Sequence, residues 1–305
     1  MSLIARLLVI TVVITWGFNF VVIRWGMEGI DPFTMTTLRF LLTSLPLVFF
    51  IKKPNIKLSI VALHGTLFGA GLWGLVNIAV SIGTPAGLAS LLLQASAFFT
   101  LLAAVYLFEE SLSFNKKVGL TVAFSGFLII LFYRQISLPL FGGFLILVAA
   151  VFWTLCNIII RKYKPENAVS FIVWSSLFVP IPVLLISLVQ SYFTKGVIDI
   201  ESIISFPTTN GWLSILFQSY VITLFGYGVW TWAITKHGLS NVAPYSLLVP
   251  VSGLLSGWFF YNETLSTTSL IGVALIMLGL CLLSFPNLKG FSLRGLTRKL
   301  HNKAR

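Results

Sequence analysis

Long apolar stretches recur along the whole chain, and short polar or turn-forming segments separate them. Each stretch is about 20 residues long, which is the length that an α-helix needs to cross a bilayer. Gly, Pro, Asn, Asp or Lys marks most of the gaps, as in Asp31-Pro32 and Lys164-Pro165. The pattern predicts ten membrane-spanning helices at 4–23, 33–51, 58–80, 86–107, 115–132, 140–160, 168–192, 212–235, 241–261 and 267–285.

The composition supports an all-α polytopic membrane protein. Of the 305 residues, 57% are hydrophobic and only 9% are charged, whereas soluble domains carry about a quarter of charged residues. Ten spans with short loops leave no room for a soluble domain. The first stretch lacks a small-residue cleavage site, so we expect a spanning helix there and not a removed signal peptide.

Positive charge is unevenly distributed between alternate gaps. With residue 1 in the cytoplasm, 16 of the 20 Lys and Arg fall on the cytoplasmic side, three fall on the other side, and Arg39 remains inside the second predicted span. Cytoplasmic loops of membrane proteins carry this excess, so the distribution predicts an even number of spans with both termini cytoplasmic. The net charge of +12 therefore indicates a membrane and not a nucleic acid partner.

The two halves of the chain resemble each other. Glu110-Ser-Leu-Ser113 and Glu263-Thr-Leu-Ser266 lie 153 positions apart, and each is followed by two glycines at the same spacing. Short similarities can arise by chance between apolar helices, but matched glycines make chance a poorer explanation. The matched pairs are Gly119 with Gly272, Gly126 with Gly279, Trp16 with Trp153, and Asn19 with Asn157.

An odd number of spans in each half has a structural consequence. Five spans carry the chain across the membrane, so the second copy enters from the opposite side. We therefore expect two inverted five-helix repeats at 1–138 and 139–286, followed by a basic cytoplasmic tail at 287–305. Many alternating-access carriers have this architecture, with the substrate site near the midplane between the halves.

Polar residues inside the predicted spans are the first candidates for a binding site, because each is costly without a partner or a wet cavity. Arg39 could hold a substrate carboxylate, or it could reach the outer headgroups or the carbonyls of a helix end. Asn19 and Asn157 could bind substrate or simply join neighbouring helices. Asn77 and Gln94 are further candidates to line a cavity.

Aromatic and proline residues complete the predicted site. Trp25 and Trp212 lie near helix ends, where tryptophan more often anchors a protein to the membrane interface. Prolines inside a helix free a carbonyl and kink the axis, so Pro180, Pro182 and Pro250 are predicted hinges. The aromatic residues predicted to face a cavity are Trp16, Trp73, Phe98, Trp153, Trp174, Tyr227, Trp230 and Tyr245.

Several kinds of chemistry are not indicated. All eight acidic residues map to helix ends or loops, so no embedded carboxylate relay is visible. Transport would then be facilitative, an exchange, or proton-linked through another group, with His64 as a modest candidate. Cys156 and Cys281 are expected to be small apolar residues. The sequence has no phosphate-binding loop, metal-ligand spacing or nucleophile elbow, so we expect no enzyme, cofactor or metal.

Four segments resemble one known family. They are Trp16-Gly-Phe-Asn-Phe-Val-Val-Ile-Arg24, Leu38-Arg39-Phe40, Pro85 to Gln94, and Leu247-Leu-Val-Pro250 through Glu263. Together they resemble the drug/metabolite transporter superfamily and, within it, the EamA family of ten-span carriers. The segments 85–99 and 243–280 are especially similar to those of bacterial exporters of cysteine and O-acetylserine.

The resemblance implies export of amino acids or related small metabolites across the bacterial inner membrane, with a small-molecule substrate and the lipid bilayer as partners. It does not fix the substrate. One alternative is a broad exporter of hydrophobic or cationic compounds, which the lack of embedded acids disfavours. A membrane scaffold or enzyme is the other, and neither would need an inverted repeat.

Overall fold

The computed structural model describes residues 1–26, 30–82, 84, 86–133, 140–197, 206–261 and 267–284. The predicted tail at 287–305 and the motif at 263–266 lie outside this part of the chain. The described residues form helices and short connections, with no strand among them. Those of the first half are α1 (Leu3–Gly26), α2 (Pro32–Val48), α3 (Leu58–Thr66), η1 (Leu67–Gly74), α4 (Leu75–Ser81), α5 (Ala86–Leu93), α6 (Ala95–Phe108) and α7 (Phe114–Tyr133).

The second half follows the same plan. Its helices are α8 (Leu140–Tyr163), α9 (Ala168–Ser176), α10 (Pro180–Lys195), α12 (Thr209–Leu216), η2 (Phe217–Tyr227), α13 (Gly228–His237), α14 (Leu239–Val242), η3 (Ala243–Leu247), α15 (Leu248–Tyr261) and α16 (Thr267–Ser284). Helix is therefore present in each of the predicted ranges.

Seven helical stretches of the described residues are long and apolar enough to cross a membrane. They are 3–23, 58–79, 89–108, 140–163, 168–193, 209–237 and 239–260. The remaining predicted ranges are occupied by α2, α7 and α16, and the crossing of a membrane by these three helices stays a prediction.

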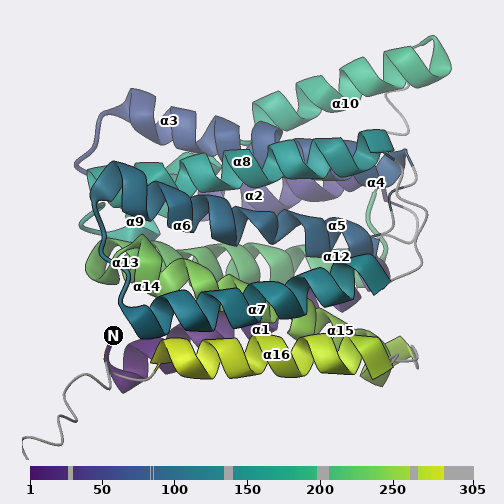
Figure 1. Cartoon of the computed structure of the whole chain (residues 1–305). Coiled ribbons are helices and arrows are strands. Elements are labelled where there is room, and N and C mark those ends of the chain that lie inside the picture. The colour runs from purple at the N-terminus through teal and green to yellow at the C-terminus, as the bar shows by residue number, and fades with distance from the viewer. Residues whose placement is uncertain are drawn as a thin grey trace, which may run out of the picture.

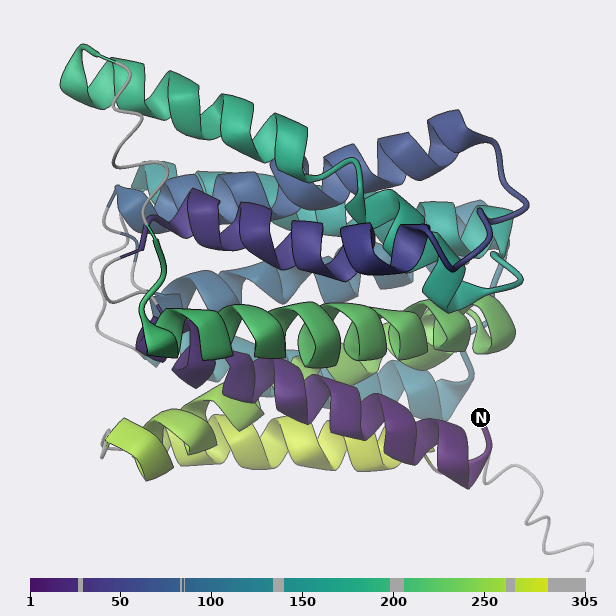
Figure 2. The same ribbon diagram turned by 180° about the vertical axis from the view of Figure 1, so that it is seen from behind.

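The helices run along roughly one direction, so that their ends gather at two opposite faces (Figures 1 and 2). We call the face that holds residue 1 the N-face. Helices α1, α3, α7, α9 and α14 begin at the N-face, and α6, α8, α13 and α16 end there (Figure 1). The first helices of the two halves, α1 and α8, therefore run in opposite directions.

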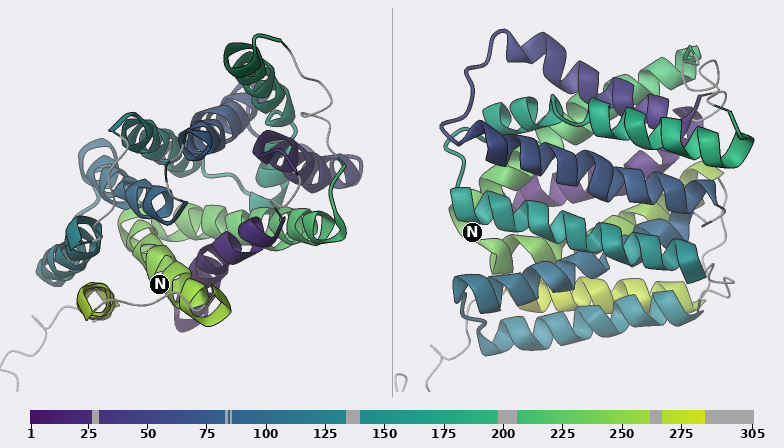
Figure 3. Two further views of the ribbon diagram at one scale, coloured as in Figure 1. Left: turned by 90° about the vertical axis from the view of Figure 1, so that its right-hand side faces the viewer. Right: turned by 90° about the horizontal axis from the view of Figure 1, so that it is seen from above.

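The pair α7 and α16 lies at one edge of the bundle (Figure 3) and is packed through the matched glycines. A Cβ on Gly126 would lie 2.5 Å from the carbonyl oxygen of Gly272, and a Cβ on Gly279 would lie 2.4 Å from that of Gly119. Each contact maps onto the other when the sequence halves are exchanged. Such reciprocal contacts are what a twofold relation between two elements produces.

Interrupted helices also occur at matching places in the two halves. The third predicted span contains the π-helical segment η1, and the eighth contains η2. A turn at Gln94 separates α5 from α6 in the fourth span, and the 3₁₀ segment η3 ends at Leu247, which is 153 positions later, in the ninth. Turns of π- or 3₁₀-helix within long helices often mark functional sites or hinges.

The predicted hinge prolines lie at helix starts and not in helix interiors. Pro180 is the first residue of α10, after a turn that follows α9, and Pro182 lies in the same first turn. Pro250 is in the first turn of α15, directly after η3. A missing N–H costs little at these positions, because the first N–H groups of a helix have no partner within it. The interruptions are present, and hinge motion at them stays a prediction.

Candidate functional site

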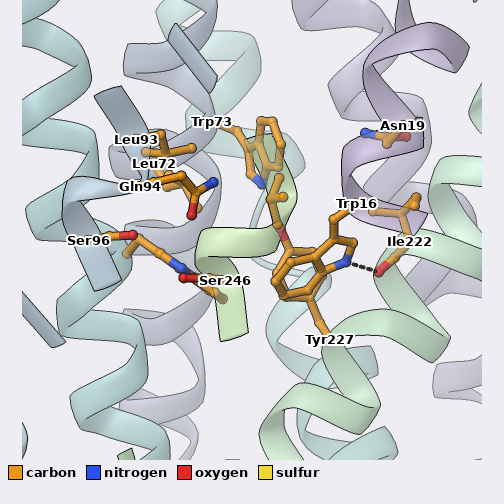
Figure 4. Close-up of a pocket in the computed structure, with 12 residues that line it drawn as sticks. Trp16, Asn19, Leu72, Trp73, Leu93, Gln94, Ser96, Ile222, Tyr227 and Ser246 are labelled. Atoms are coloured by element: carbon orange, nitrogen blue, oxygen red, sulfur yellow. Dashed lines mark hydrogen bonds between the residues drawn. The ribbon is translucent and has the colours of Figure 1, made fainter. Parts of the chain in front are cut away.

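A cavity lies in the middle of the bundle, between segments of the two sequence halves (Figure 4). Its volume is about 60 Å³, which is room for about four water molecules. Segments α1, η1 and the α5–α6 turn contribute from the first half, and α8, η2, η3 and α15 from the second. The lining residues are Trp16, Asn19, Leu72, Trp73, Leu93, Gln94, Ser96, Trp153, Ile222, Tyr227, Ser246 and Val249.

Aromatic rings join the two halves at this cavity. The ring centroid of Trp16 lies 6.2 Å from that of its repeat counterpart Trp153 and 4.6 Å from that of Tyr227. The indole N–H of Trp16 donates to the carbonyl of Ile222 at 3.5 Å (Figure 4). Gly226 permits this approach, since a Cβ there would lie 2.7 Å from the indole nitrogen. The junction of the halves is thus a packed aromatic wall.

Two lining residues present buried polar atoms without a hydrogen-bond partner. One is the Oδ1 acceptor of Asn19 and the other is the Nε1 donor of Trp73. The Trp73 nitrogen lies near the hydroxyl of Tyr227 but does not meet the geometry of a hydrogen bond to it. An unsatisfied buried polar atom costs about 1–3 kcal/mol, so water or a ligand in the cavity would be stabilised by both atoms.

Arg39 lies behind this wall and is only 2% exposed. Its Nε donates to the Thr223 hydroxyl at 2.8 Å, and its Nη1 donates to Gln218 Oε1 at 3.3 Å. Its guanidinium carbon lies 4.8 Å from the ring centroid of Trp73, a cation–π contact. The Nη2 atom has no hydrogen-bond partner, and Tyr227 lies close to the guanidinium.

The position of Arg39 excludes one of its two predicted roles, contact with headgroups or helix-end carbonyls. The side chain reaches neither the headgroups nor helix-end carbonyls, because it bonds to side chains of η2. Among the described residues no carboxylate forms an ion pair with Arg39. A buried guanidinium with a free donor and no counter-charge favours a nearby anion. Trp73 and Tyr227, which it contacts, both line the cavity, so its charge acts on the cavity through them.

The other predicted amides have different surroundings. Asn157 accepts a hydrogen bond from Trp230 Nε1 at 3.0 Å and donates to Thr100 at 3.3 Å. Asn77 donates to Thr36 at 3.0 Å. Both therefore join neighbouring helices, which is the structural alternative for such residues. Gln94 lies at the interruption between α5 and α6 and does line the cavity.

Four aromatic residues of the predicted set lie outside the cavity lining. Phe98 packs on Phe124 of α7 at 4.4 Å between ring centroids. Trp174 donates to the carbonyl of Ile51 near the N-face at 3.0 Å. Trp230 is buried against Asn157, and Tyr245 lines a smaller pocket near the start of α1.

Other lining residues were not predicted. Ser96 and Ser246 bring hydroxyl groups to the cavity, and Leu72, Leu93, Ile222 and Val249 form its apolar part. The serines lie beside the interruptions of the fourth and ninth spans, and Pro244 was the available signal for the second of these interruptions.

The acidic residues that the structure describes do not line the cavity. Asp31 caps α2 by accepting from Phe33 N and Thr34 N, both at 2.9 Å. Glu28, Asp199, Glu201 and Glu263 lie outside the described residues. His64 is buried, stacks on Phe68 and has no hydrogen-bond partner on either ring nitrogen. Among the described residues no group of His, Cys, Asp and Glu could hold a metal ion.

The helices and the central cavity together define the class of protein: a multi-pass helical membrane protein with an internal polar and aromatic site between two halves. Residues 3–132 and 140–285 both match the EamA-like transporter family. The chain belongs to this family.

The most similar relatives include two bacterial proteins with the same name. A "Probable amino-acid metabolite efflux pump" of Salmonella typhimurium is 37% identical over 95% of this chain and 97% of its own length. The protein of that name in Escherichia coli is 33% identical over 90% and 92%. A solved structure titled "Crystal structure of protein" has the same fold, with a TM-score of 0.72 at 17% identity over 92% of this chain and 98% of its own.

Proposed function

We propose that this protein is a secondary transporter that exports amino acids or related small metabolites, of the cysteine and O-acetylserine kind, across the inner membrane. The observation that carries the proposal is the central cavity, where Asn19 and Trp73 present polar atoms without partners between the two sequence halves. Most buried polar atoms have a hydrogen-bond partner, and unpartnered atoms that line a cavity are available to a ligand.

The chemistry of the cavity suits a zwitterion. Asn19 Oδ1 and the hydroxyls of Ser96 and Ser246 can accept hydrogen bonds from an ammonium group, which the aromatic faces also attract. The Trp73 N–H and the positive potential of Arg39 favour a carboxylate. The names of the two efflux-pump relatives agree with this substrate class.

Alternating access is the proposed mechanism. Ten spans arranged as two inverted repeats, 1–138 and 139–286, with both termini in the cytoplasm, would place the cavity near the midplane. The reciprocal glycine contacts of α7 and α16 and the matched interruptions support this arrangement. The ring contacts of Trp16 with Trp153 and Tyr227 join the halves at the cavity, so passage of a substrate through the bundle would require these contacts to separate.

Transport by the purified protein in liposomes tests the proposal. Vesicles preloaded with unlabelled cysteine, O-acetylserine or serine are given the labelled compound outside, and counterflow is measured. The Asn19→Ala variant loses one hydrogen bond to the substrate, so its counterflow rate should be about tenfold lower than that of the unaltered protein. Ile14→Ala on the same helix is the control, because Ile14 is half exposed and faces away from the cavity.

Two results would count against the proposal. Normal counterflow by the Asn19→Ala variant would show that the substrate does not bind at Asn19. Absence of counterflow for every amino acid, together with transport of a cationic dye, would favour a broad-specificity drug exporter, which the aromatic lining could also serve.

A further inference from the structure

The N-face side of the cavity is closed by packed apolar side chains. Ile160 of α8, Phe171 of α9, Ile234 of α13 and Leu239 of α14 are each at most 1% exposed. These helices all end or begin at the N-face, so the side chains form a layer between the cavity and that face. A substrate entering from the N-face must pass this layer.

The carboxylate of Glu110 contacts two of the helix ends that carry this layer, the start of α14 and the end of α8. Glu110 follows α6, and its two oxygens accept the backbone N–H groups of Leu239 at 3.1 Å and Ser240 at 2.9 Å. Its Oε1 also lies 2.9 Å from Nε of Arg161 in the last turn of α8. A single side chain of the first half thus holds two segments of the second half together.

The neighbouring backbone is shaped for this contact. Glu109 ends α6 in the left-handed conformation with φ of 52°, which turns the chain towards α14. Gly238 precedes α14 with φ of 84°, and a Cβ there would lie 2.7 Å from Glu110 Oε1. Close approach of the carboxylate therefore requires glycine at this position.

The charged form of Glu110 is favoured in this contact. Burial alone would raise the pKa of the carboxyl, but the hydrogen bonds from Ser240 and Leu239 and the charge of Arg161 outweigh burial. The pKa therefore lies below its ordinary value, and the Glu110 side chain is negatively charged at neutral pH. Lys116 adds a parallel link, because its Nζ donates to Asn241 Oδ1 at 2.6 Å.

We propose that Glu110 is the lock of a gate at the N-face, which holds the transport path closed at this end by binding Leu239, Ser240 and Arg161. The inference rests on the proposed transport function. Opening towards the N-face separates α14 and the end of α8 from Glu110 and exposes the apolar layer. In the alternating-access cycle, the release of this contact precedes loading from the N-face.

A native cysteine reports on the gate without any substrate. Cys156 lies one turn from Trp153 towards the N-face, is fully buried, and has its Sγ 3.9 Å from the carbonyl of His64. In a Cys281→Ser background it is the sole cysteine, since the chain has two. Its rate of reaction with a small maleimide in nanodiscs measures how often the layer opens.

Glu110→Gln should raise this rate about tenfold, because it removes the charge that strengthens three contacts. Glu109→Gln is the matched control: it makes the same chemical change at the adjacent, exposed carboxylate and should leave the rate unchanged. Gly238→Ala should raise the rate as well, because the new Cβ displaces Glu110. Thermal unfolding is followed in parallel, so that modification of unfolded protein is recognised.

If the reaction rate of Cys156 is unchanged in Glu110→Gln, or rises equally in Glu109→Gln, Glu110 does not hold the gate closed. Should Glu110→Gln not purify as folded protein, Gly238→Ala decides by the same criterion. Failure of the proposed function has a separate signature: no counterflow in any variant, whatever the thiol result.

Discussion

At the scale of residues, the two halves contribute differently to the site, although their sequences have matching asparagines. Asn157 is bonded to both Trp230 and Thr100, whereas the Oδ1 of its counterpart Asn19 has no partner. Of these two matched amides, only that of the first half has an oxygen without a hydrogen-bond donor. Asn19 lines the cavity and Asn157 does not, so the repeat leaves one amide for a ligand and uses the other to join helices.

Arg39 is expected to serve substrate binding more than folding. No carboxylate of the described residues pairs with the buried Arg39, and burial of an unpaired charge is costly. Relief of this cost should offset the lost hydrogen bonds to Thr223 and Gln218, so Arg39→Met should remain folded with a similar unfolding temperature. Loss of its charge should lower counterflow of amino acids about tenfold, because the positive potential that favours the substrate carboxylate is lost. Arg39→Lys should retain part of the flux.

The measurements for Arg39 are thermal unfolding and counterflow on the same preparations. Phe40→Leu is the control, since Phe40 is the buried neighbour of Arg39 in α2 and carries no charge. Full flux by Arg39→Met would assign Arg39 a purely structural role as the link between α2 and η2.

Part of the candidate site was predicted from the sequence, because a polar residue inside a span is costly without a partner or a wet cavity. Trp16, Asn19, Trp73, Gln94, Trp153 and Tyr227 were predicted to face a cavity, and all line it. Asn157 and Trp230 could not be told apart from them, because their partners come from other helices and depend on helix rotation. Ser96 and Ser246 were missed, since serine is common in membrane helices and carries no signal alone.

At the scale of elements, apolar length predicted helix positions well and interruptions poorly. Helix occurs in all the predicted ranges because each long apolar stretch must satisfy its backbone hydrogen bonds internally. The π-segments η1 and η2 and the turn at Gln94 were not predicted. None of the three contains a proline, so no helix-breaking residue marks them in the sequence.

The contact between α7 and α16 should tolerate no side chain at its matched glycines. Gly126→Ala and Gly279→Ala place a Cβ within 2.5 Å of a backbone carbonyl, so each should destabilise the protein by about 1–3 kcal/mol. The contact of Gly126 with Gly272 and that of Gly279 with Gly119 are about two helical turns apart, so the effects of the two substitutions should be nearly additive.

Gly228→Ala provides the control for these variants. Its Cβ would lie 3.8 Å from the nearest side-chain atom, within a helix, so stability should stay equal or rise slightly. Thermal unfolding in one detergent compares the variants. Unchanged stability of Gly126→Ala or Gly279→Ala would show that α7 and α16 can separate at no cost.

At the scale of the whole molecule, charge and symmetry carry different information. The uneven distribution of Lys and Arg predicts which face is cytoplasmic, but it says nothing about which helices pack together. The glycine spacing predicted a repeat, yet the mutual packing of the two copies at α7 and α16 became visible only in three dimensions. Contacts between segments distant in sequence depend on side-chain shape along whole helices, which periodicity does not encode.

The charge distribution predicts the orientation of the molecule, and this prediction can be measured directly. Lys53 lies on the connection between α2 and α3 at the N-face, and Phe206 lies before α12 at the opposite face, where it is 86% exposed. With both native cysteines replaced by serine, Lys53→Cys should react with a membrane-impermeant maleimide only after the cells are opened. Phe206→Cys should react in intact cells, because basic loops stay in the cytoplasm. The reverse pattern would invert the molecule, place the Glu110 gate at the outer face, and make the basic face the side of release.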